Sequence, residues 1–530
     1  MQAVSIGHAG ILIRAAGATI TCDPWFTPAF FGSWFVFPRN DRLDPALMEE
    51  ICNPDFLYVS HLHGDHFDAA FLAERMNKDV TVLLPDYPTR ELEREFNKLG
   101  FRRFIRTSHG VEREISPGVS VAIHVETSIT DGPGGDSAIV VSDATGRVVD
   151  QNDCRTHDLG ELGAHGPVDV HWLQFSGAIW YPMVYEMDAD EKKRLCEAKV
   201  ESQFARAMRY VEAIDARVVA PSAGPPCFLD PDLWGNNMIT GDEISIFPDQ
   251  TEFRRRLAAA GRSNAAVTIP GTVFTVENGT VTVTQPMDDA GVDRIFTDKE
   301  SYLRDYQRDW MPWIEAQRAS WARPATDIVG ALRLWWEPLL AMAPTLRANI
   351  GANCVINALR PDGTTDVGVY VDFLAGRVEE HREGDDQPFA FRFGIARDLL
   401  ERVIADRAFD WSNSLLLSCR FTAWRAGDYN ESLYNFLKSL SVEKMNRTEA
   451  EASMKSGARG GDEADVRIGD HIVQRRCPHR DADLAVFGEI DGCDLVCTLH
   501  GWRFDLETGA CRTAEGRSLR IRPAGPNDPS

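Results

Sequence analysis

The segment 60–66, which reads SHLHGDH, constrains this chain more than any other stretch, because it places three histidines and an aspartate within six residues. It follows the apolar run 55–59 (DFLYV), which is rich in strand formers, so the motif is expected in a loop at the tip of a strand. At an extended strand end His61 and His63 point the same way. Imidazole and carboxylate are the ligands that divalent iron and zinc prefer. The segment therefore predicts a metal site, with a solvated polar loop as the alternative.

The spacing H-x-H-x-D-H, which includes Asp65 and His66, resembles the signature of the metallo-β-lactamase family. That resemblance implies an αββα sandwich with metal bound at the edge of two sheets. A G-H-A turn and a D-P-W element, at 7–9 and 23–25, are similar to those of the ascorbate-phosphate lactonase branch of the family. By this resemblance His8 and Asp23 are expected near the active site. A core histidine satisfied by backbone is the alternative for His8.

Further ligands follow from the same resemblance. A third ligand is expected from the strand 119–125, with His124 as the first choice and Glu126 as the second. A carboxylate beside His61 and His63 would make the two-histidine, one-carboxylate face of non-haem iron oxygenases. Asp153 fits the aspartate that bridges or binds metal in the family. The alternatives are a polar side chain on the solvent face of a strand for the first two, and a turn aspartate for Asp153.

The chain departs from the family where a last histidine ligand is expected. After the strand 217–220 the sequence reads PSAG, and no histidine lies between His171 and His381. A second metal position would therefore lack its usual closing ligand. This departure puts a dinuclear hydrolase in doubt and favours one iron or an asymmetric pair.

A second cluster of ligands lies near the C-terminus in the pattern C-x-H-x17-C-x2-H, formed by Cys477, His479, Cys497 and His500. A Rieske [2Fe-2S] centre uses two thiolates on one iron and two imidazoles on the other. Four mixed zinc ligands are the competing interpretation. The spacing and the tail GWRF at 501–504 resemble Rieske ferredoxins and oxygenases. The positions of the additional disulfide of quinol-oxidising Rieske proteins hold no cysteine here, which favours a low-potential, oxygenase-type cluster.

The predicted fold is α/β with three domains, as 530 residues are too many for one core. Residues 1–292 form the αββα sandwich, and 293–446 resemble an α+β sterol-carrier-protein-2-like unit, expected to serve packing or dimerisation, with an apolar ligand pocket as the alternative. Residues 447–465, rich in Gly, Ser, Ala and charge, are expected to form a flexible linker. Residues 466–530 form an all-β Rieske domain.

The charge, the apolar runs and the cysteine content indicate which partners and which cellular location to expect. A formal charge of −24 argues against nucleic acid or an anionic membrane surface as the main partner. No apolar run approaches the ~20 residues needed to span a bilayer, and the first residues show no secretory pattern. Eleven cysteines without a disulfide rhythm favour a reducing, cytoplasmic location.

The two iron motifs together resemble Rieske oxygenases of the CMP-N-acetylneuraminate hydroxylase type. The resemblance implies an O2-dependent monooxygenase that hydroxylates C–H or N–H on a small polar molecule. Electrons would pass from NAD(P)H through a reductase and a ferredoxin or cytochrome-type carrier to the [2Fe-2S] cluster, and then to one or two non-haem irons. A homo-oligomer is compatible with this. The alternatives are a metal-dependent hydrolase with a redox-sensing Rieske domain, and electron carriage alone.

Overall fold

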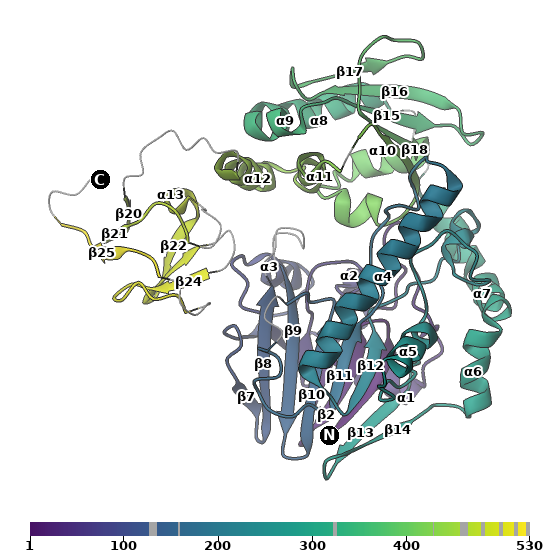
Figure 1. Ribbon diagram of the computed structural model, residues 1–530, viewed down its shortest axis with the longest axis vertical. Coiled ribbons are helices and arrows are strands. Elements are labelled where there is room, and N and C mark those ends of the chain that lie inside the picture. The colour runs from purple at the N-terminus through teal and green to yellow at the C-terminus, as the bar shows by residue number, and fades with distance from the viewer. Residues whose placement is uncertain are drawn as a thin grey trace.

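The computed structural model describes residues 1–126, 135–156, 160–321, 326–427, 429–455, 465–478, 483–497, 502–512 and 518–525. Figure 1 shows a large N-terminal domain with a second domain above it and a small C-terminal domain at one side. The predicted ligands His479 and His500 lie outside the described residues.

Two sheets form the centre of the N-terminal domain. The first has eight strands in the order β14-β13-β1-β2-β3-β4-β5-β6, and the second has six in the order β12-β11-β10-β9-β8-β7. The strands of the first sheet are β1 (Gln2–Gly7), β2 (Gly10–Ala15), β3 (Ala18–Cys22), β4 (Phe56–Tyr58), β5 (Thr81–Leu84), β6 (Arg103–Arg106), β13 (Val273–Glu277) and β14 (Thr280–Thr284). Those of the second are β7 (Arg113–Ser116), β8 (Val119–Glu126), β9 (Asp136–Asp143), β10 (Gly146–Asn152), β11 (Val170–Gln174) and β12 (Val218–Ser222).

Apolar side chains fill three layers around these sheets. Between them, Ile11 and Ile13 of β2 share a buried core with Val121 of β8 and Trp172 of β11. Helices α1 (Pro45–Cys52), α2 (Ala69–Glu74) and α3 (Glu91–Lys98) bury their apolar faces on the outer side of the first sheet. Helices α4 (Ala189–Ile214) and α5 (Gln250–Ala259) lie against the second sheet. This order of layers is the predicted αββα metallo-β-lactamase sandwich, which confirms the expected fold class.

A short 3-10 helix, η2 (Pro231–Asn236), lies between β12 and α5. Helices α6 (Asp289–Thr297) and α7 (Lys299–Ala319) follow β14, the last strand of the sandwich. They pack against the N-terminal domain, because Ile295, Leu303 and Tyr306 share a buried cluster with Phe35 and Phe37. The α6–α7 pair therefore packs on the sandwich, although the predicted domain boundary assigns most of it to the middle domain.

The middle domain has one sheet of order β17-β16-β15-β18-β19 with helices packed on it. Its elements are α8 (Ile328–Met342), α9 (Pro344–Ile350), β15 (Cys354–Leu359), β16 (Thr365–Asp372), β17 (Arg377–His381), β18 (Phe391–Ala396), α10 (Arg397–Ala405), η3 (Ser412–Leu416), β19 (Phe421–Arg425), α11 (Glu431–Lys438) and α12 (Val442–Lys455). The α+β architecture agrees with the prediction. Residues 447–455 of the expected linker are helical within α12, and 456–464 lie outside the described residues.

The first two domains are joined by backbone pairing and by a buried ion pair. The segment 184–186 pairs with β19 through Glu186 N–H to Ala423 O at 2.7 Å and Ala423 N–H to Val184 O at 2.9 Å. Arg420, 7 % exposed, contacts the fully buried Asp230 at 2.8 Å and donates to Gly32 O at 3.0 Å. One apolar core continues through both domains. The two domains therefore form a single packed body.

The C-terminal domain consists of two three-stranded antiparallel sheets, β20-β21-β25 and β22-β23-β24, with a short helix α13 (Leu484–Phe487). The strands are β20 (Val466–Ile468), β21 (His471–Val473), β22 (Gly488–Asp491), β23 (Asp494–Cys497), β24 (Trp502–Asp505) and β25 (Ile521–Pro523). These small antiparallel sheets agree with the predicted all-β domain.

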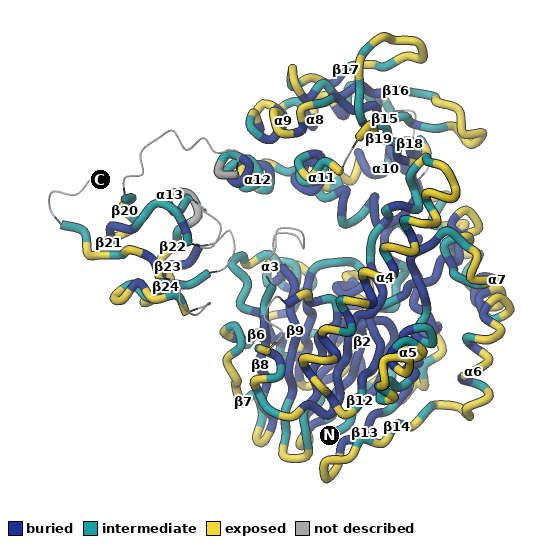
Figure 2. Tube along the Cα trace, viewed as in Figure 1, coloured by how far each residue is buried: buried dark blue, intermediate teal, exposed yellow. Residues whose placement is uncertain are grey.

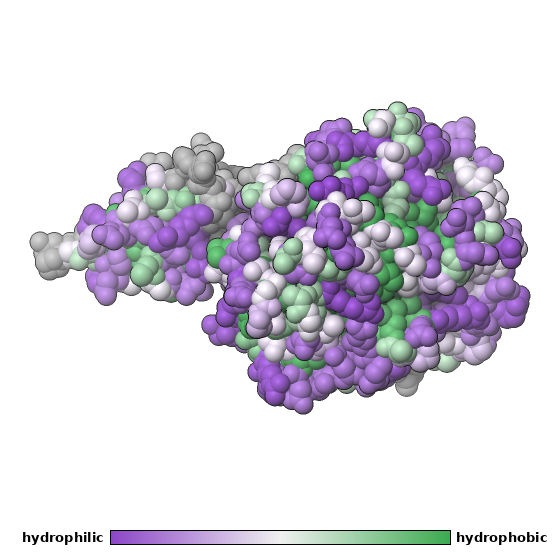
Figure 3. All heavy atoms as spheres, turned by 90° about the horizontal axis from the view of Figure 1, so that it is seen from below, coloured by the Kyte–Doolittle hydropathy of each residue, from purple (hydrophilic) through white to green (hydrophobic). Residues whose placement is uncertain are grey.

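Burial is concentrated in the central strands of the sandwich, while turns and outer helix faces are exposed (Figure 2). On the face drawn in Figure 3 hydrophilic side chains predominate and the C-terminal domain projects to one side. Among the described residues, no helix combines the length and the apolarity required to cross a lipid bilayer.

The Arg420–Asp230 pair gives the first testable prediction. Arg420→Ala removes one of the two arginines that pair with the buried Asp230, the other being Arg318, and the loss of this charged contact between the two domains costs about 2 kcal/mol of unfolding free energy. The control Arg382→Ala removes an exposed pair with Glu380, which contributes little. Thermal unfolding of both variants measures the difference. We expect the midpoint to fall by several degrees for the first and to stay unchanged for the second; equal midpoints would contradict the structural role of the pair.

Candidate metal centre

The motif loop is positioned by the end of β4 and by the cap of α2. The chain leaves β4 at Tyr58 and enters α2 at Ala69, so the ligand-rich residues lie at the sheet edge. Asp68 caps α2 by accepting from Phe71 N at 3.0 Å, and its other oxygen accepts from Thr27 N. A single buried carboxylate thereby ties the motif loop to the segment after β3.

His61 and His63 converge on one point. Nε2 of His61 lies 2.8 Å from Nδ1 of His63. On the far side of its ring, His61 Nδ1 lies 2.9 Å from Ser60 Oγ and 3.2 Å from Asp136 Oδ1. Since Ser60 Oγ donates to Asp23, the Nδ1 of His61 carries the proton and its Nε2 presents a lone pair to His63. Two nitrogens so placed require a proton or a cation between them.

His66 is held in the same way. Its Nδ1–H donates to Asp23 Oδ2 at 2.7 Å, so the lone pair is on Nε2. That nitrogen is buried, has no hydrogen-bond partner among the described residues, and lies 3.6 Å from Asp153 Oδ1 and 3.9 Å from Asp65 Oδ2. Asp153 Oδ1 and His63 Nε2 also lack such a partner there. A buried lone pair that faces two carboxylates is unfavourable unless a cation lies among them.

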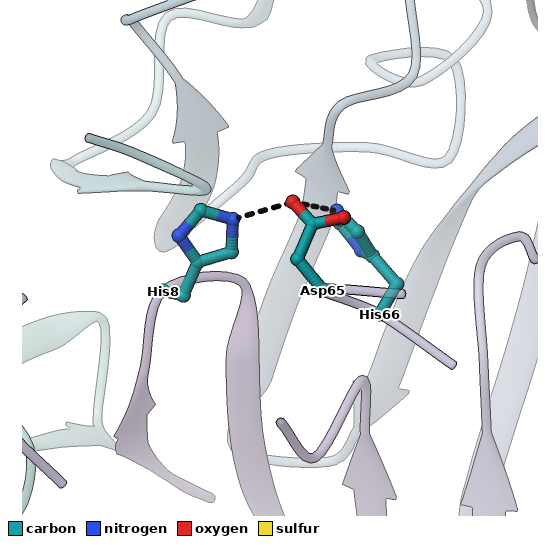
Figure 4. A group of neighbouring side chains, drawn as sticks. All are labelled: His8, Asp65 and His66. Carbon is teal, nitrogen blue, oxygen red and sulfur yellow. Dashed lines mark hydrogen bonds and ion pairs between the residues drawn. The ribbon is translucent and has the colours of Figure 1, made fainter. Parts of the chain in front are cut away.

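His8 completes this group from the turn between β1 and β2. Figure 4 shows the rings of His8 and His66 approaching the Asp65 carboxylate from two sides, with His8 Nε2 at 3.1 Å from Asp65 Oδ2. Ala223 N–H donates to His8 O at 3.0 Å. The end of β12, where a family histidine is missing, therefore abuts the His8 turn.

Backbone strain gathers at the same place. His8, Asp23, Asn152 and Ala223 have φ values of 53°, 43°, 39° and 47°, a region that non-glycine residues rarely adopt. Such strained residues cluster at functional sites, where surrounding structure fixes them. All four lie at or just beyond strand ends, at the sheet edge that bears the ligands.

The electrostatics of the group favour bound positive charge. Burial opposes charge on His66, but Asp153, Asp23 and Asp65 raise its pKa well above its usual value. Burial would raise the pKa of Asp65, yet His66 and His8 bring it below its ordinary range. Burial and the neighbouring His61 lower the pKa of His63. Imidazole and carboxylate atoms within 4.8 Å of one another can thus hold a metal in two overlapping groups, His8–Asp65–His66 and His61–His66–Asp153.

The predicted third ligands lie differently from the motif residues. His124 Nε2 is 2.8 Å from His165 Nε2, and its Nδ1 is 3.4 Å from Glu161. His124 and Glu161 form a separate group of ligand type with His109. Glu126 is the last residue of β8, opposite Asp136 of β9 in the sheet register. The carboxylate that reaches His61 is that of Asp136.

Sequence reasoning missed Asp136 because it follows a glycine-rich stretch that resembles a turn. The structure places it at the start of β9, next to β8, with its Oδ1 also accepting from Ser137 N at 2.7 Å. The usable signal was its position two residues before the apolar run 138–141 (AIVV), which is typical of a buried strand. Ser60 was likewise not singled out, although it touches Asp23, His61 and His66.

Two cavities meet the metal centre. The larger, of about 760 Å³, is lined by His63, Asp65, Asp136 and Asp153 at one end and reaches the middle domain. The smaller, of about 400 Å³, is lined by His61, His63 and Tyr87, and by residues of α3 and α12. The centre is therefore accessible from a volume suited to a small molecule.

The Rieske cysteines are buried in the C-terminal domain. Cys477 and Cys497 are both 0 % exposed and share one core with Val473, Leu495 and Phe504. Cys497 ends β23, and Cys477 follows β21. Two buried cysteines, one at the end of a strand of one sheet and one just after a strand of the other, agree with the thiolate half of a Rieske ligand set.

Sequence comparisons extend these observations. Residues 328–454 match the family described as Rv3818-like, SCP2-like domain, and 466–520 match the Rieske [2Fe-2S] domain. A cytidine monophosphate-N-acetylneuraminic acid hydroxylase of Mus musculus is 23 % identical over 241 residues, which cover 42 % of this chain and 39 % of that protein.

Solved structures are similar in fold at low identity. The metallo hydrolase Igni18 of Ignicoccus hospitalis is 17 % identical with a TM-score of 0.35, covering 54 % of this chain and 99 % of that one. CmlA, a diiron β-hydroxylase from Streptomyces venezuelae, is 16 % identical with a TM-score of 0.32, covering 52 % and 54 %. The fold assignment itself stands on the layers and strand order.

Two mycobacterial proteins match the chain from end to end. A Rieske 2Fe-2S iron-sulfur protein of Mycolicibacterium smegmatis is 41 % identical over 529 residues, which cover 98 % of this chain and 100 % of that protein. The protein Rv3818 of Mycobacterium tuberculosis, of the same description, is 41 % identical over 527 residues, covering 98 % and 99 %. The chain therefore belongs to this family of Rieske 2Fe-2S iron-sulfur proteins.

Proposed function

We propose that the protein is a Rieske-type non-haem iron monooxygenase that hydroxylates a small molecule in the larger cavity. One observation carries the proposal: a Rieske domain shares the chain with a buried set of histidine and carboxylate atoms that lack partners and open onto that cavity. A Rieske cluster has no substrate chemistry of its own, so a second centre that can use its electrons explains their coexistence.

The ligand roles follow from the geometry. His61 and His63 would hold one iron through the two nitrogens that converge at 2.8 Å. His8, Asp65 and His66 would hold a second, with Asp153 between the two positions. The cluster would be held by Cys477, Cys497, His479 and His500.

When bound, the cluster supplies single electrons and the iron supplies a binding site at which dioxygen is reduced. In the overall reaction one C–H or N–H bond of the substrate is replaced by C–OH or N–OH. Dioxygen, two electrons and two protons are consumed, and one water is released. The electrons come from an external one-electron carrier of the ferredoxin or cytochrome class, supplied by NAD(P)H through a reductase.

The chain's own residues prepare the site for this chemistry. Asp23 accepts the Nδ1 proton of His66, and Asp136 with Ser60 fixes the ring of His61, so both rings present Nε2 inward. Middle-domain side chains, among them Phe391, Trp424 and Tyr434, line the same cavity as the metal-end residues and reduce the space left for bulk water there.

A direct connection joins the Rieske domain to the metal loop. Arg503 Nη2, in β24 next to the Rieske motif, lies 3.6 Å from Asp86 Oδ1. The next residue, Tyr87, donates its hydroxyl proton to the carbonyl of Ser60, which precedes His61. One ion pair and one hydrogen bond, joined by short stretches of backbone, thus link the two halves of the proposed electron path.

Metal analysis of variants tests the ligand assignment. His61→Ala combined with His66→Ala is expected to lose the non-cluster iron and to keep the visible absorbance of the [2Fe-2S] centre. Cys477→Ser is expected to do the reverse. The control His124→Ala, in the separate histidine group, is expected to keep both. Loss of non-cluster iron in the control, or zinc in its place in iron-replete protein, would refute the assignment, and zinc would favour a metal-dependent hydrolase.

Oxygen incorporation tests the reaction class. Dithionite-reduced protein is mixed with a pool of small metabolites and exposed to 18O2, and the products are analysed by mass spectrometry. We expect one product that carries a single 18O atom, and none from Cys477→Ser protein. A product labelled from H2 18O with unlabelled oxygen gas would instead indicate hydrolysis.

The role of Tyr87 is tested by the rate at which the reduced cluster is reoxidised. Tyr87→Phe removes the hydrogen bond to Ser60 and is expected to slow reoxidation by O2 by about tenfold, with unchanged iron content. Tyr302→Phe removes a buried phenol that accepts from Arg39, remote in the chain from the Rieske contact, and serves as the control. An unchanged rate in Tyr87→Phe would show that the connection is not used.

A further inference from the structure

The larger cavity has one wall made of basic and amide side chains. Lys199, Gln203 and Arg206 line it from α4, and Arg155 lines it from the loop after β10. The helix residues are four and three positions apart, so they occupy one face of α4. Arg155 is two residues from Asp153, which brings the wall to the metal end of the cavity.

Among the described residues, no carboxylate forms an ion pair within 4.0 Å with the Arg155, Lys199 or Arg206 side chain, and these three side chains make no hydrogen bond there. By contrast, Arg318, Arg392 and Arg420 near the domain junction are each paired with a carboxylate. Burial lowers the pKa of Lys199, and the positive charges of Arg155 and Arg206 lower it further. Burial and then Arg155 lower the pKa of Arg206 to about 10.

The amide of Gln203 points to the same conclusion. Gln203 is 2 % exposed, and neither its Nε2 nor its Oε1 has a hydrogen-bond partner among the described residues. Its amide lies over Gly177, where any added Cβ would collide with it. A buried amide without partners in a cavity wall is costly unless a ligand satisfies it.

Another part of the cavity lining is aromatic. Trp180 stacks on Tyr434 with ring centroids 5.6 Å apart, and Arg425 lies over the rings of Tyr181 and Tyr185 at 5.1 Å. These residues come from the junction of the sandwich with the middle domain, and all line the cavity. The aromatic rings of this surface suit a flat or apolar body, and Arg425 adds a positive charge beside them.

We propose that the cavity binds a small molecule with a carboxylate or phosphate group, held by Lys199, Gln203, Arg206 and Arg155, and with an apolar or ring-shaped body held by the aromatic wall. The net charge of the chain is −24, so its overall charge does not attract anions. A local group of unpaired basic side chains in the cavity is therefore best explained by recognition of an anionic ligand at that place. The cavity of about 760 Å³ suits a molecule of drug size.

This inference rests on the proposed function only for the substrate role of the ligand, since binding can be measured without turnover. The basic residues are dispersed between positions 155 and 206 of the sequence and converge only in the fold.

Calorimetric titration of the oxidised, iron-loaded full-length protein tests the proposal with phenyl phosphate, benzoate and neutral benzyl alcohol. We expect at least one of the two anions to bind at least tenfold more tightly than benzyl alcohol. The stronger of the two identifies the anionic group. The double variant Lys199→Gln/Arg206→Gln is expected to weaken its binding at least tenfold with unchanged iron content.

The matched control removes one lysine charge and one arginine charge from the same helix, at positions outside the cavity. Lys193 and Arg209 are exposed on α4 and do not line the cavity, so Lys193→Gln/Arg209→Gln is expected to bind as the parent does. The proposal would be overturned if benzyl alcohol bound as tightly as the anions, or if both double variants weakened anion binding equally. It would also be overturned if the Lys199→Gln/Arg206→Gln protein bound the anion normally and only removal of the iron abolished binding. Absence of oxygenase activity with intact anion binding would refute the proposed function alone.

Discussion

The structure of the site depends on buried lone pairs that face one another and face carboxylates. Asp23 fixes the proton of His66 on Nδ1, and Ser60 with Asp136 fixes that of His61, so the inward nitrogens have lone pairs and no donors of their own. In a buried setting this arrangement is unfavourable by itself. In the proposed iron-bound protein, a cation among these atoms would turn the repulsion between lone pairs into attraction, which would offset the strain of the turns at His8 and Asp23.

The middle domain contributes side chains to the cavity that adjoins the candidate metal centre. Pairing of 184–186 with β19 and the Arg420–Asp230 contact fix this domain on the sandwich, and its aromatic residues line that cavity. We expected packing or dimerisation as its main role from the sequence. In the structure its side chains also line the cavity proposed to bind substrate.

The sequence could predict those parts of the site that are contiguous. The motif at 60–66 and the paired Cys-x-His and Cys-x2-His segments specify chemistry through spacing alone, and the sandwich and Rieske folds follow from them. Asp136, the placement of His8 beside the end of β12, and the basic wall on α4 depend on which strand and helix ends meet in space. His124 illustrates the same limit: its strand was recognised, but the neighbours of its ring were set by the loop that bears Glu161 and His165.

Anomalous diffraction from crystals of the iron-replete protein, collected on both sides of the iron edge and the zinc edge, tests the central claim most directly. The account predicts iron peaks in the C-terminal domain, and at least one more iron peak where His61 Nε2 and His63 Nδ1 converge or among His8, Asp65 and His66. Absence of any metal peak at the sandwich edge, or a peak that appears only at the zinc edge, would contradict it.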